Sequence, residues 1–329
     1  MITVLKPGLL TTVQDLGRPG YQQYGIVVGG ALDAFAARVA NLILGNDDNA
    51  AVLEMAQTGP ELRFEQDTLV AWCGADFEAH IGNQPLPPER AVHVAAGETI
   101  TFGFPKSGLR AWLAVAGGID VPLVLGSRTT YRRAGIGGHQ GRPLIAGDRL
   151  GIGARSERAG HILVSLQAAG RRSTAWTVRP GTLGRTPPAG TVRAVRGPEW
   201  SWFTPAAQHL LFASDWLATK EADRMGVRLQ GPALTLLKPR EMISSAVNTG
   251  VVQVPADGQP IVLLPSRQSV GGYPRLAAVA AADIGRFTQM RPGDKVRFQE
   301  ITLAAAHELF LARERDLSRI RLGLARMAG

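Results

Sequence analysis

The sequence predicts a mainly β protein with a few short helices and a helical C-terminal tail. Most segments alternate in polarity or stay apolar for about five to eight residues, and Gly, Pro, Asn or Asp bounds them. Helical periodicity is confined to three places. The 329 residues, 45% of them hydrophobic and 19% charged, are typical of a folded chain with room for two domains.

The expected strands follow from this alternation. They cover residues 61–64, 68–73, 77–81, 99–104, 109–115, 192–195 and 295–298. The single cysteine, Cys73, falls inside one of these apolar runs, so we interpret it as a buried structural thiol.

Three segments have helical periodicity. Residues 31–44 place Phe35, Val39 and Leu42 on one side and end at Gly45, and Asp33 fits the helix N-terminus better than a catalytic role. A short helix is expected at 283–290. The third, at 303–327, has charges on one side and indicates a solvated or partner-facing tail.

A connector between two domains is indicated where Arg, Gly, Ser and Pro become frequent. We therefore predict a first β domain at 1–155, a connector at 156–190, a second β domain at 191–300 and a helical tail at 301–329. A weak sequence similarity between residues 55–62 and 228–234 suggests that the chain has two similar halves.

Positive charge is concentrated in one region of the chain. The net charge is +9, and residues 126–200 contain thirteen arginines, no lysine and three acidic residues. Such a cluster attracts an acidic partner, or an anionic substrate such as ATP or a carboxylate. Nucleic acid is disfavoured, because the arginines are not interleaved with aromatic residues.

Several classes of protein are excluded by missing motifs. No lysine follows a glycine, which rules out the Gly-Lys-Ser/Thr phosphate loop, and no zinc or serine-hydrolase motif occurs, so no metal site is expected. The N-terminus lacks the pattern of a signal peptide, and no apolar run is long enough to span a membrane. A cytoplasmic location is expected by default.

Polar residues gather in a turn-rich segment near the N-terminus. Gln14, Asp15 and Arg18 lie in residues 11–21, and Gly29-Gly30 follows. Glycine lets the backbone approach a ligand closely, while the three polar side chains can converge on it. The alternative is a turn in which Asp15 and Arg18 simply pair.

The sharpest feature is the arginine- and glycine-rich segment 126–142. It contains Arg128, Arg132, Arg133 and Arg142 together with Tyr131 and His139. The guanidinium group of arginine binds carboxylate or phosphate through two parallel hydrogen bonds, and exposed backbone N–H groups of glycine-rich loops form anion sites. A basic surface loop without a ligand is the alternative.

A third group lies in the second half of the chain. Residues 223–229 precede Gln253 and then Gln268, which is followed by Gly271-Gly272-Tyr273-Pro274. A glutamine amide donates and accepts at once, which suits recognition of an amide, lactam or ureido group.

Together these segments resemble the family variously called biotin-dependent carboxyltransferase, allophanate hydrolase subunit 2 or the C-type subunit of 5-oxoprolinase. The matching segments are 11–21, 29–33, 117–122, 125–142, 223–229 and 268–274. The resemblance covers roughly residues 1–155 and 190–300, and leaves out the connector and the tail.

The resemblance implies a pair of cyclophilin-like β-barrel domains with a cleft between them. It also implies a B-type partner, similar to allophanate hydrolase subunit 1, and an A-type partner. The assembly would use ATP, in a site of this chain or one shared with a partner, to open the lactam of 5-oxo-L-proline to L-glutamate. The chain alone would be inactive or nearly so.

Roles for individual residues follow from this resemblance. Arg128, Arg132, Arg133 and Arg142 would bind the anionic parts of the substrate, and Gln14, Gln253 and Gln268 would recognise its amide. Asp15 and Arg18 would also belong to the substrate-binding residues. Tyr131, His139 and Tyr273 would orient the substrate or transfer protons. This assignment requires the loop at 126–142 and the glutamine-bearing turns to face each other across one pocket.

Two departures from the family pattern keep other functions open. Ser245 and Ser266 stand where relatives commonly carry carboxylates. One alternative is the carboxyltransferase component of a biotin-dependent, urea-type carboxylase, with biotin carried by another protein because this chain has no Met-Lys-Met site. The other is a regulatory protein that antagonises its B-type partner.

Overall fold

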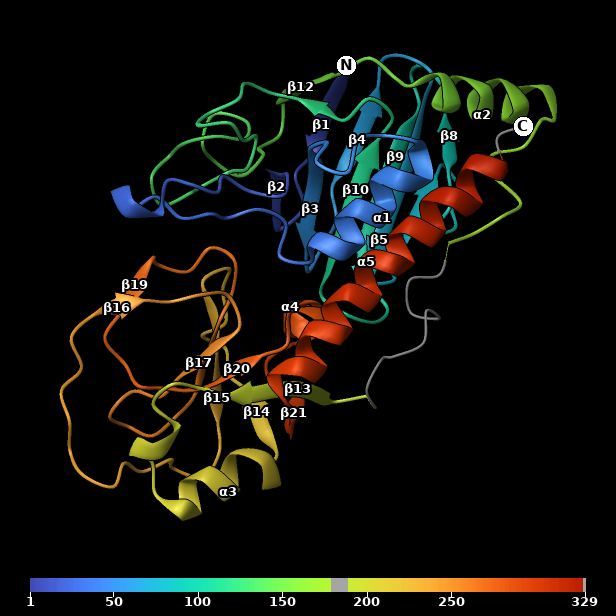
Figure 1. The fold of residues 1–329 in the computed structure, drawn as a ribbon. Coiled ribbons are helices and arrows are strands. Elements are labelled where there is room, and N and C mark those ends of the chain that lie inside the picture. The colour runs from blue at the N-terminus through green and yellow to red at the C-terminus, as the bar shows by residue number, and fades with distance from the viewer. Residues whose placement is uncertain (179–188, 328–329) are drawn as a thin grey trace. The chain divides into compact units, whose positions relative to one another are not determined.

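The computed structural model describes residues 1–178 and 189–327, which divide into two compact units (Figure 1). The described part of the first unit comprises residues 1–18, 29–178 and 316–327. That of the second comprises residues 19–28 and 189–315. Each unit has its own strands and is described by itself.

The first unit contains two sheets. The larger has seven strands in the order β11 (Ile119–Asp120), β12 (Arg149–Ile152), β1 (Ile2–Lys6), β4 (Glu61–Phe64), β9 (Thr99–Pro105), β6 (Phe77–Ile81) and β7 (Gln84–Pro85). The smaller has five, in the order β2 (Leu10–Gln14), β3 (Val52–Ala56), β10 (Arg110–Val115), β5 (Thr68–Gly74) and β8 (Val92–Val94).

The core of the first unit contains residues of both sheets. Alternate side chains of the strands meet there, and Trp72 of β5 packs edge-to-face on Phe102 of β9 with ring centroids 5.2 Å apart. Cys73 is buried on β5, and burial raises the pKa of its thiol. The interpretation of Cys73 as a structural thiol fits this position.

Helix α1 (Ala34–Leu44) packs against β5 and β10 of the smaller sheet (Figure 1). It begins at Asp33, whose carboxylate accepts hydrogen bonds from the N–H groups of Phe35 and Ala36. It ends at Gly45, which has φ +72°. The predicted helix and the capping role of Asp33 are confirmed.

The predicted connector begins with ordered structure that belongs to the first unit. Helix α2 (Glu157–Ala168) starts at the N-cap Ser156, and Arg158 donates to the carbonyl of Leu42 in α1. Residues 172–178 then follow the edge strand β8, with hydrogen bonds from His93 N to Arg172 O and from Thr174 N to Ala91 O. Residues 179–188 of the predicted connector lie outside the described part.

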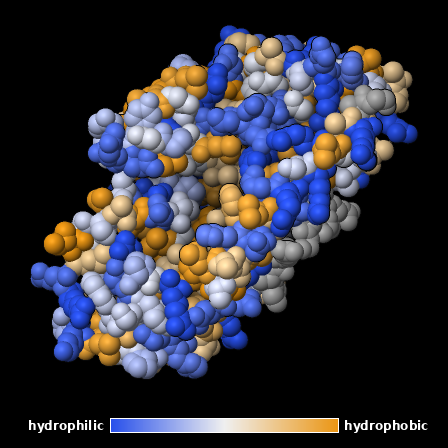
Figure 2. Space-filling model, viewed as in Figure 1, coloured by the Kyte–Doolittle hydropathy of each residue, from blue (hydrophilic) through white to orange (hydrophobic). Residues whose placement is uncertain are grey.

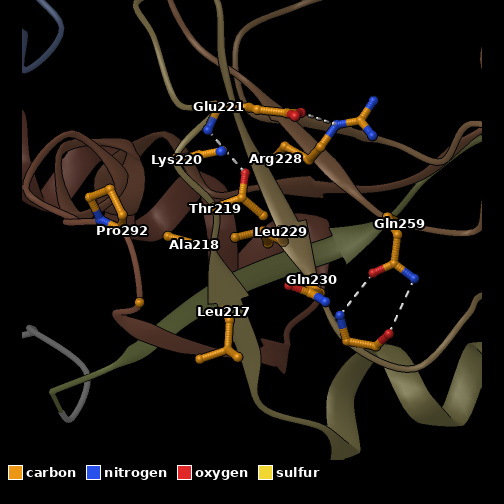
Figure 3. Close-up of a pocket in the computed structure, with 12 residues that line it drawn as sticks. Leu217, Ala218, Thr219, Lys220, Glu221, Arg228, Leu229, Gln230, Gln259 and Pro292 are labelled. Carbon is orange, nitrogen blue, oxygen red and sulfur yellow. Dashed lines mark hydrogen bonds and ion pairs between the residues drawn. The ribbon is translucent and has the colours of Figure 1, made fainter.

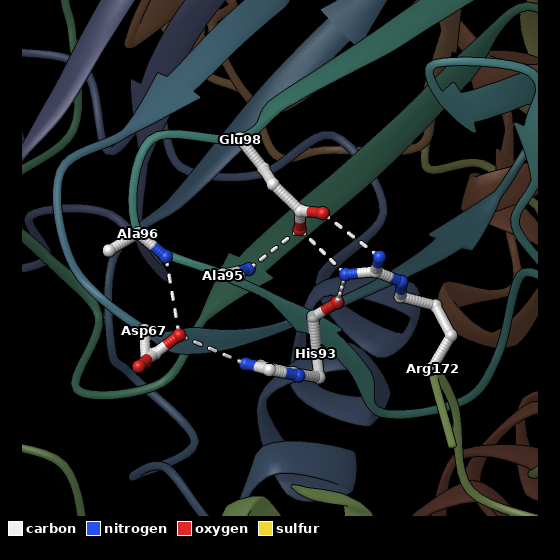
Figure 4. A network of polar contacts seen from close by, with 6 residues as sticks. All are labelled: Asp67, His93, Ala95, Ala96, Glu98 and Arg172. Atoms are coloured by element: carbon white, nitrogen blue, oxygen red, sulfur yellow. Dashed lines mark hydrogen bonds and ion pairs between the residues drawn. The ribbon is translucent and has the colours of Figure 1, made fainter. Parts of the chain in front are cut away.

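A polar network fixes this segment to the edge of the sheet (Figure 4). Arg172 binds both carboxylate oxygens of Glu98 at 2.6 and 2.9 Å and also donates to the carbonyl of His93. Burial alone would raise the pKa of Glu98, but the hydrogen bonds from Arg172 and Ala95 lower it. Composition could not reveal this attachment, because Arg172 and Glu98 are far apart in sequence.

The second unit is built around a closed barrel. Its strands run in the order β13 (Thr191–Arg196), β20 (Arg275–Val279), β17 (Val251–Gln253), β18 (Ile261–Leu263), β15 (Gly226–Gln230), β14 (Trp216–Ala218) and β21 (Lys295–Glu300). The parallel pair β13–β21 closes it. Two short strands, β16 (Ser245–Ala246) and β19 (Val270–Gly271), form a separate ribbon.

Short helices complete the second unit. Helix α3 (Pro205–Ala213) packs against β21 and was not expected from the sequence, whereas α4 (Ile284–Thr288) lies inside the segment predicted at 283–290. The mainly β class, the closed barrel and the few short helices agree with the predicted fold.

The predicted tail forms helix α5 (Leu303–Arg326). Its residues from Asp316 onward belong to the first unit, where Leu317 and Leu324 are buried and Arg321 forms an ion pair of 2.7 Å with Asp48. This half of the helix is therefore packed rather than fully solvated. Within residues 1–178 and 189–327, no helix is both long and apolar enough to cross a membrane.

Candidate functional site

The arginine- and glycine-rich loop at 126–142 is held by one buried carboxylate. Asp15, 3% exposed at the end of β2, accepts hydrogen bonds from Ser127 Oγ (2.7 Å), Thr129 Oγ1 (2.8 Å) and the backbone N–H of Arg128 (2.6 Å). It also accepts from the N–H of Gly17 at 2.8 Å. Asp15 is thus the anchor of the loop.

Arg18 lies against the same loop but does not bind Asp15 directly. Its guanidinium donates to the carbonyls of Thr129 and Val124, and the side chain is 1% exposed. Burial lowers the pKa of Arg18, and the nearby negative charge of Asp15 opposes this shift. The alternative of a simple Asp15–Arg18 pair is replaced by an arrangement in which both residues hold Thr129.

Two buried polar atoms at this place have no hydrogen-bond partner. They are Oε1 of Gln14 and Nη1 of Arg18. Nε2 of Gln14 donates to Thr12 Oγ1 at 2.9 Å and to the carbonyl of Thr130 at 3.5 Å. Gln14 and Arg18 therefore contact the adjacent residues Thr130 and Thr129, and they leave one acceptor and one donor unused.

The glycines allow the loop to pack this closely. A Cβ at Gly137 would collide with the Thr129 carbonyl and the Arg18 guanidinium, and one at Gly138 would collide with Thr130. Both glycines have positive φ. The N–H groups of Gly135, Gly138 and Gly141 donate to carbonyls within the loop, so they are already used there.

His139 and Arg142 share one carboxylate, that of Asp148. Arg142 binds both oxygens of Asp148 at 2.7 and 2.8 Å, and His139 Nε2 lies 3.3 Å from Oδ1. The Ile145 N–H adds a further bond of 2.8 Å. Sequence reasoning missed Asp148 as a partner. The signal for it was the Gly147-Asp148 turn, which follows the loop directly.

We expect Asp148→Asn to remove a pH-dependent part of the stability. The bonds from Arg142, helped by the Ile145 N–H and the charge of His139, outweigh burial and hold the pKa of Asp148 at about 2 instead of 3.8. A lowered folded-state pKa stabilises the fold above about pH 4, and this contribution disappears as the pH falls toward 2. It amounts to about 1–2 kcal/mol after solvent screening.

The measurement is the free energy of unfolding in urea between pH 6 and pH 2 for both proteins. The wild-type chain should lose its advantage over Asp148→Asn between pH 4 and pH 2. A constant difference across this range would contradict the role given to Asp148.

The four loop arginines differ in how far their charge is already engaged. Arg128 donates to the carbonyl of Val121 and lies 3.3 Å from Asp120, and Arg142 is bound to Asp148. Arg133 has an interaction of its own within the described residues. Arg132 is exposed and has no ion pair or side-chain hydrogen bond there, which leaves its charge available to a ligand.

The two tyrosines assigned to proton transfer make no side-chain hydrogen bond within the described residues. Tyr131 is half-buried, and its backbone bridges to Ile136 across the loop. Tyr273, in the second unit, is 47% exposed, and its carbonyl accepts from the amide of Gln253 at 3.3 Å. The catalytic roles of Tyr131, His139 and Tyr273 stay predictions.

Gln253 and Gln268 occupy different environments in the second unit. Gln253 is 2% exposed on β17, and a Cβ at Gly271 of the ribbon would lie 2.6 Å from its Nε2. Gln268 is exposed. The loop at 126–142 belongs to the first unit and the two glutamines belong to the second, and each unit is described separately. A pocket shared between the loop and the glutamines therefore also stays a prediction.

A groove of about 740 Å³ lies beside β14 and β15 in the second unit (Figure 3). Two of its charges face each other, since Arg228 pairs with Glu221 at 3.3 Å and also with Asp257 at 3.0 Å. Gln259 is bound to Gly231 by two hydrogen bonds. With these groups engaged and none of the predicted residues present, we do not assign a function to this groove.

Metal-ligating side chains do not gather in the described residues. No group of three or more His, Cys, Asp or Glu side chains suited to a metal ion occurs in residues 1–178 and 189–327. Most of the predicted substrate-binding residues instead carry amide or guanidinium groups, which bind anions and amides.

Comparison with known proteins identifies the family. Residues 24–300 match the family model described as "Carboxyltransferase domain, subdomain A and B". The chain therefore belongs to this carboxyltransferase-domain family, as the sequence motifs predicted.

Relatives of similar length carry one particular name. The chain is 40% identical to the C-type 5-oxoprolinase subunit of Escherichia coli over 306 residues, which covers 93% of each chain. It is 35% identical to the protein of the same name from Haemophilus influenzae, over 98% of each chain. Among solved structures, the urea amidolyase of K. lactis superposes with a TM-score of 0.86 at 26% identity, over 97% of this chain and 20% of that one.

Proposed function

We propose that this chain is the C-type subunit of an ATP-dependent 5-oxoprolinase, which opens the lactam of 5-oxo-L-proline to give L-glutamate. The observation that carries the proposal is full-length similarity to two bacterial proteins that are named as this component of 5-oxoprolinase. A subunit of this kind acts with partners, and we propose the B-type and A-type subunits for that role.

The chemistry of the first unit supports a substrate with an amide and an anionic group. A lactam offers a carbonyl acceptor and an N–H donor side by side. Arg18 Nη1 is an unused donor, and Gln14 Oε1 is an unused acceptor. Arg132 adds an uncommitted positive charge for a carboxylate or phosphate.

ATP is proposed as the co-substrate, although this chain has no Gly-Lys-Ser/Thr phosphate loop. Of the residues described, Arg132 fits a phosphate best, because its guanidinium is exposed and unpaired. A site completed by a partner protein is consistent with this small contribution. Within the complex, ATP would supply the free energy that drives ring opening.

The experiment is reconstitution with the B-type and A-type partners. The complex should release phosphate from ATP in proportion to 5-oxoproline, and this chain alone should not. Phosphate release that is independent of 5-oxoproline would overturn the assignment.

A second function has its own support from a fungal relative. The chain is 30% identical to the urea amidolyase of Lachancea kluyveri over 93% of its length, although it spans only 17% of that protein. Under this alternative the chain transfers a carboxyl group from carboxybiotin on another protein to a urea-type acceptor. Formation of a carboxylated urea that depends on a biotinylated carrier would favour it.

A regulatory role through a B-type partner is the third reading. Replacing Arg128 and Gln268 by Ala would then leave the cellular phenotype intact, whereas changes that abolish partner binding would remove it.

A further inference from the structure

A buried arginine in the second unit has no acidic partner. Arg267 is 7% exposed, and no carboxylate of the described residues lies within ion-pair distance of it. Its Nε donates to the carbonyl of Val247 at 3.1 Å, and its Nη1 donates to Thr249 Oγ1 at 3.0 Å. Burial lowers its pKa. A buried charge without a counterion is costly, which makes this position unusual for a purely structural residue.

Hydrogen bonds at the ribbon of β16 and β19 bring Arg267 close to Ser269 and Ser245. Ser245 pairs with Gly271, and the N–H of Val247 donates to the carbonyl of Ser269. The carbonyl of the same Val247 accepts from Nε of Arg267, so Arg267 and Ser269 both contact the residue that directly follows β16. A Cβ at Gly271 would lie 2.6 Å from Nε2 of the buried Gln253, so the ribbon packs on the barrel at this position.

Two hydroxyls near Arg267 are unused. Oγ of Ser245 and Oγ of Ser269 are buried and have no hydrogen-bond partner. Gln268 and Val270 of the same segment are exposed, and Figure 2 shows hydrophobic and hydrophilic residues interspersed on the surface that it draws. This segment thus combines exposed side chains with buried polar groups that have no partner.

We propose that Arg267, with the hydroxyls of Ser245 and Ser269, binds a small free carboxylate beside the ribbon. The two bonds of its guanidinium leave three of the five N–H groups, one on Nη1 and two on Nη2, to bind the two oxygens of a carboxylate. Its single uncompensated charge suits a monoanion better than a phosphate dianion. The hydroxyls would donate to the same oxygens after a rotation about χ1. This site lies wholly in the second unit and does not depend on the proposed oxoprolinase activity.

The test is binding of acetate to the full chain by isothermal titration calorimetry, with acetamide as the neutral isostere. Acetate should bind saturably, and acetamide should not. Arg267→Met should weaken acetate binding at least tenfold, as expected for a lost charge-assisted pair. The double variant Ser245→Ala/Ser269→Ala should weaken it about threefold to tenfold. Arg63→Met, which removes an exposed arginine of β4, is the matched control and should bind acetate normally.

Three outcomes would overturn the proposal. They are equal heats from acetate and acetamide, acetate binding to Arg267→Met as tight as to the wild-type chain, and binding of sulfate or phosphate in preference to acetate. If Arg267→Met does not fold, the serine double variant and Arg267→Lys decide, since both keep the positive charge. The double variant must then bind more weakly than the wild-type chain, and Arg267→Lys must keep part of the affinity while losing the two-pronged contact.

Discussion

Replacing Asp15 by Ala is expected to destabilise the chain by about 3–5 kcal/mol and to release the loop at 126–142. The change leaves the N–H groups of Gly17 and Arg128 and the hydroxyls of Ser127 and Thr129 without their buried acceptor. It also removes the negative charge nearest to the buried Arg18. Chemical unfolding measures the free energy, and hydrogen–deuterium exchange measures the opening of the loop.

Asp33→Ala is the matched control for this prediction. Asp33 is the same residue type in the same unit, but it only caps α1 through the N–H groups of Phe35 and Ala36. Loss of such a cap costs about 1 kcal/mol and should leave exchange in the loop unchanged. Equal losses of stability in the two variants would show that Asp15 is not the anchor of the loop.

Gly137→Ala is the second change with a large expected effect. A Cβ at this position collides with the backbone carbonyl of Thr129 and with the Arg18 guanidinium, at a residue with φ +70°. We expect a loss of at least about 3 kcal/mol and a displaced Arg18, because the collision adds to the cost of a positive φ. Unfolding in urea measures the loss of stability, and a crystal structure of the variant shows the position of Arg18.

Gly135→Ala separates the collision from the backbone effect. Gly135 has a similar φ of +65°, but an added Cβ there meets no atom within 4 Å. Its cost should be about 1 kcal/mol, which is the cost of the backbone conformation alone. A Gly137→Ala variant as stable as Gly135→Ala would mean that the loop yields and that the packing against Arg18 is unimportant.

The features that the sequence predicted well are local ones. The helix at 34–44 has its cap, its periodicity and its terminal glycine within one short segment, so its bounds were predicted closely. The mainly β class followed from alternation and turn residues. Helix α3 was missed because its apolar residues do not form a clear stripe, and its N-cap Thr204 followed by Pro205 was the signal available.

The partners of the site residues could not be predicted, because they depend on contacts between distant segments. The sequence indicated that Asp15 and the loop at 126–142 matter, but not that this carboxylate binds Ser127, Arg128 and Thr129. Similarly, Gln268 attracted attention through its glycine-rich surroundings but is exposed, whereas its neighbour Arg267 is buried and donates to Val247 and Thr249. These contacts join residues 20 and 18 positions apart, which spacing within one motif does not reveal.

We expect that the loop anchored by Asp15 supplies the positive charge that the activity needs, rather than a surface that binds a partner. Arg132→Gln is the variant to measure, because this exposed arginine has no partner among the described residues and its loss should leave the fold intact. In the complex reconstituted with both partner proteins, 5-oxoproline-dependent phosphate release should fall at least about tenfold, while partner affinity stays within about twofold. Unchanged phosphate release, with or without weaker partner binding, would contradict the claim.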